Sequence, residues 1–329
     1  MRIAKKRAKP LYISKLEALL RRLPENHPKA TLIKQDLLKR QIGYRGEKSL
    51  DFYLDSLSMQ KELTILHDLR LRGENGHFFQ IDTILINPSL IIILEVKNIA
   101  GSLYLNPLTQ QMIRTTRTTE EVFHYPLLQT QMQKNQLKEW LASHQWPLLQ
   151  LVDLIVVSDP TTRIVVDSTN QHLMNQVIHA ARLPDSISKI LRKQPEHSIP
   201  SQKLNELVLT LIKNHIESSI EVLSKYEIGP TELECGVNCP SCLQLSMQRK
   251  KGRRVWICDT CGKTSKNAHF QSLEDYFLLI EPTITNRSLR HFLKIESPQL
   301  AHSLLSSNCP SFTGTYKNRT YTIPYPLLP

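Results

Sequence analysis

The fold of this chain is decided by the stretch FQIDTILINPSLIIILEVKN, which runs from Phe79 to Asn98. Two apolar, β-branched runs flank a Pro-containing turn at residues 87–89, and such runs are typical of neighbouring antiparallel strands. If the hairpin closes at this turn, residue numbers across it sum to about 177, and Asp82 lies opposite or nearly opposite Glu95. The stretch therefore predicts a β-hairpin that holds the Cβ atoms of two acids about 5 Å apart.

The same hairpin sets a lysine beside the two acids. Side chains alternate along a strand, so Glu95 and Lys97 share one face while Val96 points to the other. Carboxylates opposed in apolar surroundings repel each other and are costly to desolvate, and a divalent metal ion is the simplest way to offset both effects. The alternative is a solvated salt-bridge cluster at a strand edge. Because both strands read as buried on both faces, we favour the metal site.

The residues in and around the hairpin resemble a known nuclease signature. Asp82 followed by Glu95-Val96-Lys97 is similar to the signature of the PD-(D/E)XK nuclease superfamily. The order of four blocks resembles more narrowly the NERD (nuclease-related) domain of many bacterial proteins, over about residues 41–160. These blocks are Gly43-Tyr44-Arg45-Gly46-Glu47, His67-Asp68-Leu69-Arg70-Leu71, Gln80-Ile81-Asp82 and Leu94-Glu95-Val96-Lys97-Asn98.

The resemblance implies a fold, a reaction and a metal. The fold is α/β, with a restriction-endonuclease-like mixed sheet flanked by helices, and the reaction is metal-dependent hydrolysis of phosphodiester bonds in nucleic acid, with DNA expected first. Asp82 and Glu95 would bind Mg²⁺ or Mn²⁺, hard cations that suit carboxylate oxygen, and the main-chain carbonyl of Val96 would complete the ligands. Lys97 would lie beside the attacking water, where its charge favours hydroxide and stabilises the transition state.

Two further residues join the site through the resemblance. Glu47 is expected to open a helix, where an acid in the first turn ordinarily complements the helix dipole. The family places the corresponding Glu beside the metal, to orient the attacking water or to hold a second ion. Gln129 ends a Pro-Leu-x-Gln segment, which in the family opens a helix and turns its Gln toward the site. Many relatives carry Asn before that Pro, where this chain has Tyr125.

The remaining hydrophobic pattern alternates strands and helices, which is typical of an α/β sandwich with a mixed sheet. Residues 43–49 superficially resemble a phosphate-binding loop, but the Gly before Lys48 that a Walker motif needs is missing and no apolar strand precedes them. We therefore reject an ATPase. The pattern predicts strands at about 63–71, 77–86, 90–97, 102–105, 111–117 and 151–157, and helices at about 11–23, 30–41, 47–57, 125–143 and throughout 170–224.

Charge is unevenly distributed along the chain. The net charge is +12, and residues 1–40 hold 12 Lys and Arg against 3 acidic residues. Such asymmetry suggests an anionic partner, with nucleic acid ahead of a membrane surface. The alternative is a solvated basic arm that has no partner.

Targeting and membrane segments are not visible. Residues 1–10 are basic, but no apolar signal region follows them, and no apolar run reaches the ~18 residues of a membrane span. We expect a cytoplasmic protein without a membrane partner. In a reducing compartment the six cysteines would serve as metal ligands or inert thiols.

Four of the cysteines have zinc-ribbon spacing. Four thiolates complete the tetrahedral shell of Zn²⁺ and leave no open position, so this zinc would be structural. A redox role for either pair is the weaker alternative, because two matched pairs at this spacing would be a coincidence. Cys235 and Cys309 are expected to be spare. The pattern C-x₂-C-x₁₅-C-x₂-C joins Cys239, Cys242, Cys258 and Cys261.

The loop between the two cysteine pairs is strongly basic. Cations surround Gly252 and an aromatic residue follows, a composition that suits phosphate contact and base stacking. The alternative is a solvated hairpin tip. The candidate nucleic-acid-binding residues are Arg249, Lys250, Lys251, Arg253, Arg254 and Trp256.

The C-terminal segment resembles a winged-helix fold. A short helix over 284–293, a second helix from Ser297-Pro298 through Leu305, and a hairpin over 314–323 give the order helix, turn, helix, wing. Such a fold would turn one face of the second helix to a nucleic-acid groove, whereas the apolar pattern is equally compatible with a packing domain. The face comprises Gln299, His302, Ser303 and Ser306.

The leading hypothesis is a metal-dependent nuclease whose zinc ribbon assists substrate binding. Two alternatives stay open: a nucleic-acid-binding protein whose nuclease fold has lost activity, and a scaffold that holds a protein partner. The expected domains are a basic helical N-terminal arm (1–40), the NERD domain (41–165), a helical connector (166–230), the zinc ribbon (231–268) and a winged-helix-like domain (269–329).

Overall fold

The computed structural model describes residues 1–57, 63–193, 198–249 and 255–327. The chain forms two compact units, and each combines segments that are distant in the sequence. Unit 1 contains residues 1–9 and 39–218, and unit 2 contains residues 10–38 and 219–329. The long helix α2 (Ala30–Asp55) contributes to both. The hairpin with the predicted acids thus belongs to unit 1, and the six cysteines belong to unit 2.

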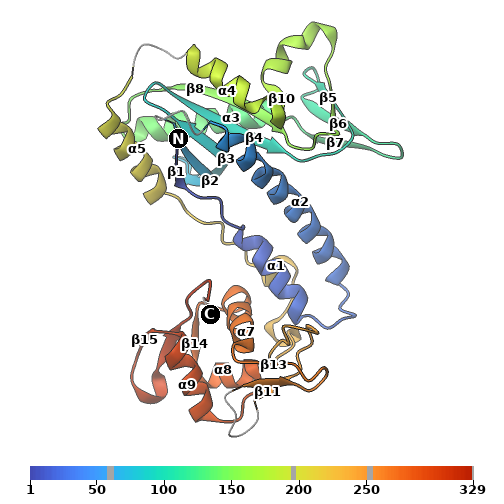
Figure 1. Cartoon of the computed structure of the whole chain (residues 1–329), viewed down its shortest axis with the longest axis vertical. Helices are drawn as coiled ribbons and strands as arrows, with labels where there is room; N and C mark the ends of the chain where they lie inside the picture. Colours follow the sequence, from blue (N-terminus) through green and yellow to red (C-terminus); the bar gives the residue numbers. More distant parts are fainter. Residues whose placement is uncertain (58–62, 194–197, 250–254, 328–329) are drawn as a thin grey trace. The chain divides into compact units, whose positions relative to one another are not determined.

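A six-stranded sheet forms the centre of unit 1 (Figure 1). Its strands are β1 (Arg2–Lys5), β2 (Thr64–Arg72), β3 (Phe78–Ile86), β4 (Leu90–Lys97), β8 (Gln150–Val157) and β10 (Val177–His179). They lie in the order β1-β2-β3-β4-β8-β10. Strands β2, β3 and β4 are antiparallel neighbours, whereas β1 pairs with β2, and β8 with β4 and β10, in parallel. The sheet is therefore mixed, as the sequence predicts.

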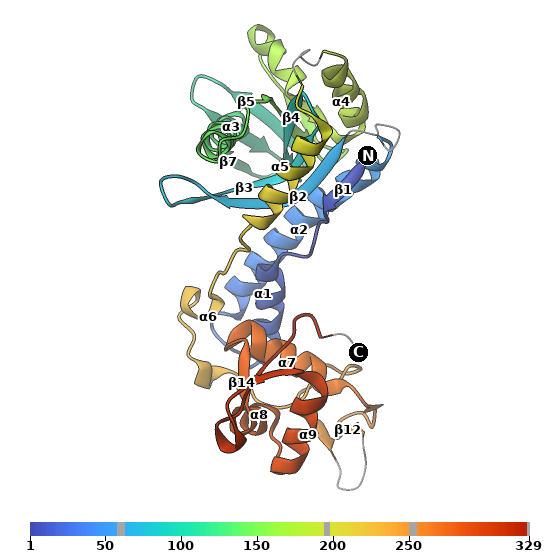
Figure 2. The ribbon, with the colours of Figure 1, turned by 90° about the vertical axis from the view of Figure 1, so that its left-hand side faces the viewer.

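Helices cover both faces of this sheet (Figure 2). Odd-numbered residues of β4, such as Ile93, pack with α3 (Pro126–Ser143) and α5 (Ser201–Lys213). Even-numbered ones, such as Ile92, pack with α2 and with α4 (Leu183–Arg192) on the opposite face. A strand that is buried on both faces has a continuous apolar sequence. The two apolar runs of this hairpin could therefore be predicted as strands from the sequence. The three layers confirm the predicted α/β class.

A second sheet of four strands extends unit 1. Leu103 and Leu105 from this sheet pack against Ile155 of β8. The sequence predicts β5 and β6 but neither the exposed β7 nor the three-residue β9, because neither carries a clear hydrophobic alternation. The strands, in the spatial order β7-β6-β5-β9, are β5 (Ser102–Asn106), β6 (Gln111–Thr115), β7 (Glu120–His124) and β9 (Arg163–Val165).

Helix α2 corrects a sequence prediction. Two helices were expected, the second opened by Glu47, but the structure has one helix from Ala30 to Asp55 with Glu47 in its interior. The prediction is wrong because Gly43 and Gly46 look like breakers, whereas a Gly inside a helix costs only about 1 kcal/mol relative to Ala. Gly46 marks close approach to the sheet, since a Cβ there would lie 2.3 Å from the Cβ of Asn98.

The segment after β9 is less helical than the sequence predicts. Strand β10 lies within it and joins the central sheet beside β8, so the prediction of continuous helix over 170–224 is wrong. Three residues are too few to show strand alternation in a sequence. The other elements are η1 (Ser168–Asn175), η2 (Ala180–Arg182), α4, α5 and α6 (Val222–Lys225).

Unit 2 has a hydrophobic core that joins the cysteine-rich segment to the C-terminal helices. Met247 and Trp256 from the cysteine-rich segment share this core with Leu289 and Phe292. The N-terminal helix α1 (Leu11–Arg22) packs with α7 in the same unit. The other elements are η3 (Pro230–Glu232), β11 (Met247–Arg249), β12 (Trp256–Cys258), β13 (Thr264–Ser265), α7 (Ala268–Leu279), β14 (Thr283–Thr285), α8 (Asn286–Leu293), α9 (Pro298–Asn308), β15 (Ser311–Thr313), η4 (Tyr316–Asn318) and β16 (Thr320–Thr322).

The C-terminal elements follow one another as α7, β14, α8, α9, β15 and β16. The three strands form an antiparallel sheet in the order β14-β16-β15. Helix α9 begins at the predicted cap, where the Ser297 hydroxyl accepts a hydrogen bond from the Leu300 N–H at 3.2 Å. The predicted helices and hairpin are present, with the hairpin strands starting at Ser311 rather than near Gly314. In the described parts of the chain, no helix has the length and apolar character needed to cross a membrane.

Candidate active site

The β3–β4 hairpin has the predicted register. Thr83 pairs with Leu94, so residue numbers across the hairpin sum to 177. The β3–β4 pairing runs from the turn to this pair and stops there, so it does not include the adjacent residues Asp82 and Glu95. Beyond it, the Val96 N–H donates to Asp82 Oδ2 at 2.9 Å. The Asp82 carboxylate thus takes the position of a main-chain acceptor, at the point where β3 and β4 stop pairing.

Glu95 is held by three side chains. Its Oε1 accepts hydrogen bonds from Lys97 Nζ and from Gln129 Nε2, each at 2.7 Å. Its Oε2 accepts from Gln133 Nε2 at 2.9 Å, and Gln129 Oε1 accepts from Lys97 Nζ at 2.9 Å. These contacts offset the cost of burying a carboxylate that is only 3% exposed. The structure therefore brings Glu95, Lys97 and Gln129 together.

Helix α3 positions the two glutamines. Pro126 stands at its start, where a fixed φ and a missing N–H are favourable. The spacing of four residues places Gln129 and Gln133 on one face of the helix. Gln133 also donates to the main-chain oxygen of Gln80, at 3.0 Å. Gln133 is absent from the sequence prediction, and its only sequence signal is this spacing from Gln129.

Asp82 lies where negative charges meet. Its side chain keeps some exposed surface, yet the surrounding atoms desolvate the carboxyl. This desolvation, together with the charges of Glu95 and Glu47, raises the pKa of Asp82 well above its usual range. The Val96 N–H and the Lys97 ammonium act in the opposite direction. The cluster therefore has more negative charge than its own cations offset.

Glu47 reaches this cluster from α2. Burial, with the charges of Asp68 and Glu95, raises the pKa of Glu47 to about 7, and Arg7 opposes this shift. The Arg7 Nη1 donates to Glu47 Oε2 at 2.9 Å. Arg7 is also absent from the sequence prediction, which assigns it to the basic arm. No local pattern marks it, because its contact with Glu47 spans 40 residues of chain.

The donor chemistry of the site fits a divalent cation. Asp82 and Glu95 supply carboxylate oxygens at neighbouring strand positions, and such hard ligands suit Mg²⁺ and Mn²⁺. The Oε1 of Gln133 is buried beside them, and no hydrogen-bond partner for it lies among the described residues. Two carboxylates and the expected Val96 carbonyl make a small ligand set. Within the described segments, the only group of three or more His, Cys, Asp or Glu ligand atoms within 4.8 Å of one another is the cysteine cluster.

The cysteine cluster of unit 2 has the geometry of a tetrahedral thiolate site. The Sγ atoms of Cys239 and Cys261, and those of Cys242 and Cys258, are 3.6 Å apart. Zn–S bonds of about 2.3 Å imply tetrahedral edges of about 3.8 Å, close to these values. A hydrogen bond from the Ser246 hydroxyl, with further donation by the Thr260 and Cys261 N–H groups, lowers the pKa of Cys258 to about 6. The four sulfurs can therefore bind a metal such as zinc.

The ribbon loop corrects one candidate residue. Trp256 is 1% exposed, and its Nε1 donates to His269 Nδ1 at 3.1 Å. Its prediction as a base-stacking residue is therefore wrong, because the ring belongs to the core of unit 2. Arg249 pairs with it across β11 and β12, with the guanidinium 5.6 Å from the ring centroid. The other candidates, Lys250, Lys251, Arg253 and Arg254, lie outside the described residues.

Helix α9 turns a polar face to solvent. Ala301 and Leu305 are buried on its inner side. His302 Nδ1 lies 3.1 Å from the Tyr321 hydroxyl of β16, which links the helix to the hairpin. The exposed residues include those expected from the sequence, Gln299, His302, Ser303 and Ser306.

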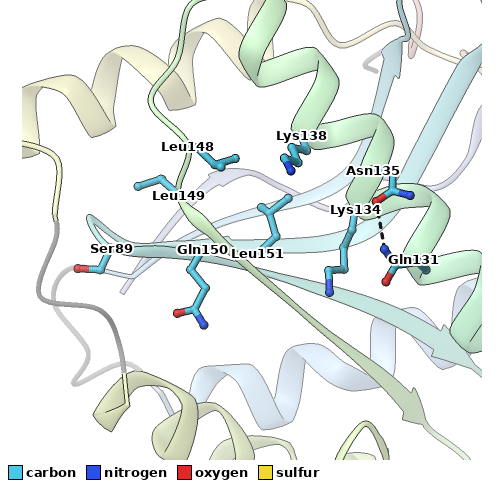
Figure 3. Close-up of a pocket in the computed structure, with 9 residues that line it drawn as sticks. All are labelled: Ser89, Gln131, Lys134, Asn135, Lys138, Leu148, Leu149, Gln150 and Leu151. Carbon is cyan, nitrogen blue, oxygen red and sulfur yellow. Dashed lines mark hydrogen bonds between the residues drawn. The ribbon is translucent and has the colours of Figure 1, made fainter.

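A cavity of about 490 Å³ lies between the middle of α3 and the start of β8 (Figure 3). Leu148 and Leu149 line it together with Lys138, and Lys134 also borders it. The Lys134 ammonium is already paired with Asp153 Oδ1 at 2.8 Å. None of the acids or amides around Asp82 lines this cavity. It is separate from the candidate active site.

Comparison with protein families agrees with the geometry. Residues 42–172 match the family model described as NERD, the nuclease-related domain. No curated protein and no solved structure matches the chain. The chain therefore contains a nuclease-related domain, which the sequence predicts at about residues 41–160. This domain includes Glu47, Asp82, Glu95, Lys97 and Gln129 but neither Arg7 nor the cysteine cluster.

Proposed function

We propose that the chain is a metal-dependent nuclease that hydrolyses phosphodiester bonds of nucleic acid, with DNA as the favoured substrate. One observation carries this proposal. A buried Glu95 is fixed by Lys97, Gln129 and Gln133, and its charge acts on the desolvated carboxyl of Asp82 on the neighbouring strand. A purely structural ion pair would need neither two amide clamps nor a second, partly exposed acid with a raised pKa.

Asp82 and Glu95 are the side chains that would hold Mg²⁺ or Mn²⁺, with the Val96 carbonyl as a third ligand. When bound, the ion would supply Lewis-acid polarisation of the phosphodiester and a lowered pKa for the attacking water. Gln129 and Gln133 hold the Glu95 carboxylate in one orientation, which reduces the reorganisation needed for binding.

Lys97 and Glu47 act on the reacting groups. The Lys97 side chain is 19% exposed, so its ammonium can contact an incoming phosphodiester while it remains bonded to Glu95. There it stabilises the negative charge that develops on the phosphoryl oxygens. Glu47, whose pKa is about 7, orients the attacking water and can accept its proton near neutral pH.

Unit 2 would bind the substrate. Four cysteine thiolates would hold a structural Zn²⁺ beside the β11–β12 hairpin. The order of elements from α7 to β16 agrees with the expected winged-helix resemblance. In such a fold α9 presents Gln299, His302 and Ser303 to a groove, and the basic loop contacts phosphates.

The test is cleavage of plasmid, linear and single-stranded DNA with Mg²⁺, Mn²⁺ or EDTA, by the wild type and by Lys97→Ala. We expect cleavage with either metal, none with EDTA, and a loss of about 10²–10³-fold in kcat for Lys97→Ala. Lys138→Ala, an exposed lysine farther along α3, is the matched control and should cleave normally. Equal rates for Lys97→Ala and wild type in clean preparations would refute the assignment.

The second candidate is a nucleic-acid-binding protein without turnover. The absence of metal-dependent cleavage on every substrate, together with DNA binding that weakens steeply with salt, would favour it. A chain that neither cleaves nor binds DNA would instead act as a scaffold for a protein partner.

A further inference from the structure

Arg7 is a buried cation at the edge of the acidic cluster. Its side chain is 3% exposed, although it lies in the short segment between β1 and α1. Its Nη1 donates to Glu47 Oε2 at 2.9 Å, and its Nε donates to Asp51 Oδ1 at 3.3 Å. One guanidinium therefore contacts two carboxylates on successive turns of α2. It provides them with positive charge from within the protein.

The remaining guanidinium nitrogen is also engaged. Arg7 Nη2 lies 2.9 Å from His67 Nδ1 and donates to Thr83 Oγ1 at 3.0 Å. Arg has only donors, so His67 Nδ1 must be an acceptor, and the imidazole is neutral. This agrees with burial and the charges of Arg7 and Lys5, which lower the pKa of His67 to about 3. In this group of four partners, Arg7 is the cation.

The chain holds Arg7 in this position. Strand β1 pairs in parallel with β2, with Arg2 opposite Thr64 and Ile3 opposite Ile65. Lys5 Nζ donates to the main-chain oxygens of His67 and Asp68, at 3.0 and 2.9 Å. The residues directly before Arg7 are thus anchored to β2 by main-chain pairing and by the Lys5 ammonium. Arg7 is part of the fold of unit 1.

Arg7 is also linked to the main chain of Asp82 through Thr83. The Thr83 hydroxyl that accepts from Arg7 donates to the main-chain oxygen of Asp82 at 2.8 Å. A second divalent ion shared by Glu47 and Asp82 would have to occupy the space beside this guanidinium. The ion and the guanidinium are both positively charged, so they would repel each other strongly in this partly buried site. The Oε2 of Glu47 is moreover already used by Arg7.

We propose that the Arg7 guanidinium takes the place of a second divalent cation at Glu47, so that the site binds one Mg²⁺ or Mn²⁺, at Asp82 and Glu95. The inference rests on the proposed function and decides between the two roles that the family resemblance leaves open for Glu47. Glu47 orients the water and does not bind an ion. Arg7 is a positioning residue, which acts through Glu47.

The first test counts Mn²⁺ on the intact, zinc-loaded chain by electron paramagnetic resonance of the free ion. We expect one tightly bound Mn²⁺ per chain, weakened at least about 100-fold by Asp82→Asn. Two bound ions in the wild type would overturn the inference and leave the proposed function standing. No bound ion would overturn both.

The second test uses variants of the pair. Glu47→Gln should keep the one bound Mn²⁺ with the affinity of the wild type, and loss of that ion would overturn the inference. Arg7→Ala should gain a second Mn²⁺, which Glu47→Gln in the same chain removes. Arg114→Ala, which breaks an ion pair with Glu121 elsewhere in unit 1, is the matched control and should bind one ion. A folded Arg7→Ala variant that still binds a single Mn²⁺ would overturn the inference. If this variant fails to fold, the numbers of Mn²⁺ ions bound by the wild type and by Glu47→Gln decide whether the inference holds.

Discussion

The Glu95 carboxylate depends on its neighbours for its orientation. Gln133 donates to its Oε2 and also to the main-chain oxygen of Gln80, so Gln133→Ala should leave Glu95 with one restraint fewer. We expect kcat to fall about 10- to 100-fold, the usual effect of losing a group that orients a metal ligand. Gln131→Ala, an exposed residue on the same helix, is the control and should cleave at the wild-type rate. Equal rates for both variants would contradict the role of Gln133.

His67 makes the stability of unit 1 depend on pH. Its pKa is about 3 in the folded chain, against 6.5 as its ordinary value. Between pH 6.5 and pH 3 the unfolded chain binds a proton at His67 that the folded chain does not bind. The contribution of His67 to the free energy of unfolding is therefore fully present above pH 6.5 and is lost as the pH falls. Glu47, with a raised pKa of about 7, shifts stability in the opposite direction.

The variant His67→Gln isolates this contribution. Gln keeps an oxygen that can accept from Arg7 but does not titrate. We expect the urea midpoint of the wild type to fall more steeply than that of His67→Gln as the pH is lowered from 6.5 to about 4. Parallel pH profiles for the two proteins would show that His67 is not held neutral.

At the residue scale, the sequence predicts which side chains lie together when strand alternation and a tight turn determine their positions. Asp82, Glu95 and Lys97 lie within one hairpin, so their common location follows from strand geometry. Arg7 and Gln133 reach the same place from other elements. Their contacts with Glu47 and Glu95 span 40 and 38 residues of chain, and no local pattern encodes such contacts.

At the scale of elements, α2 offers a matched pair of glycines. A Cβ at Gly46 would lie 2.3 Å from Asn98 Cβ and 2.7 Å from Ser158 Oγ, whereas nothing lies within 4 Å of one at Gly43. Gly46→Ala should therefore destabilise unit 1 by about 1–3 kcal/mol through overpacking. Gly43→Ala should stabilise it by about 0.5–1 kcal/mol, because Ala favours the helix.

Urea unfolding of the two variants tests this difference. Opposite shifts of the midpoint are expected, with Gly43→Ala as the control for helix propensity. Two equal shifts would contradict the close approach of α2 to the end of β4. The sequence could not separate these glycines, because the contact that distinguishes Gly46 is made with Asn98 across the sheet edge. The same limit applies to Trp256, which is buried in the core of unit 2 and donates to His269 of α7.

At the scale of the whole molecule, unit 2 depends on a helix from the start of the chain. Arg22 of α1 donates to Asp275 Oδ2 at 2.8 Å and to the Gly236 main-chain oxygen at 2.9 Å, and both charged side chains are 0% exposed. Arg21 also donates to Asp275, at Oδ1, so removing Arg22 leaves the buried carboxylate with one of its two cations. Such pairing between distant segments is invisible in the sequence, which is why residues 1–40 read as an arm.

Arg22→Met should therefore destabilise unit 2 by about 1.5–3 kcal/mol, the range for losing hydrogen bonds to a charged group. Release of zinc during urea unfolding, followed with a chromophoric chelator, reports on this unit separately from unit 1. The double variant Arg22→Met/Asp275→Leu removes both charges and should recover much of the loss, as replacement of a buried pair by apolar groups does. Zinc release from Arg22→Met at the wild-type midpoint would contradict the dependence on α1.

The most direct measurement of the central claim is the rate at which the wild type and Asp82→Ala cleave labelled DNA in Mg²⁺. We predict that the variant loses at least about 100-fold in rate while it still binds DNA, because the carboxylate removed belongs to the proposed metal site of unit 1. Cleavage by Asp82→Ala at the wild-type rate, in a preparation free of other nucleases, would contradict the account.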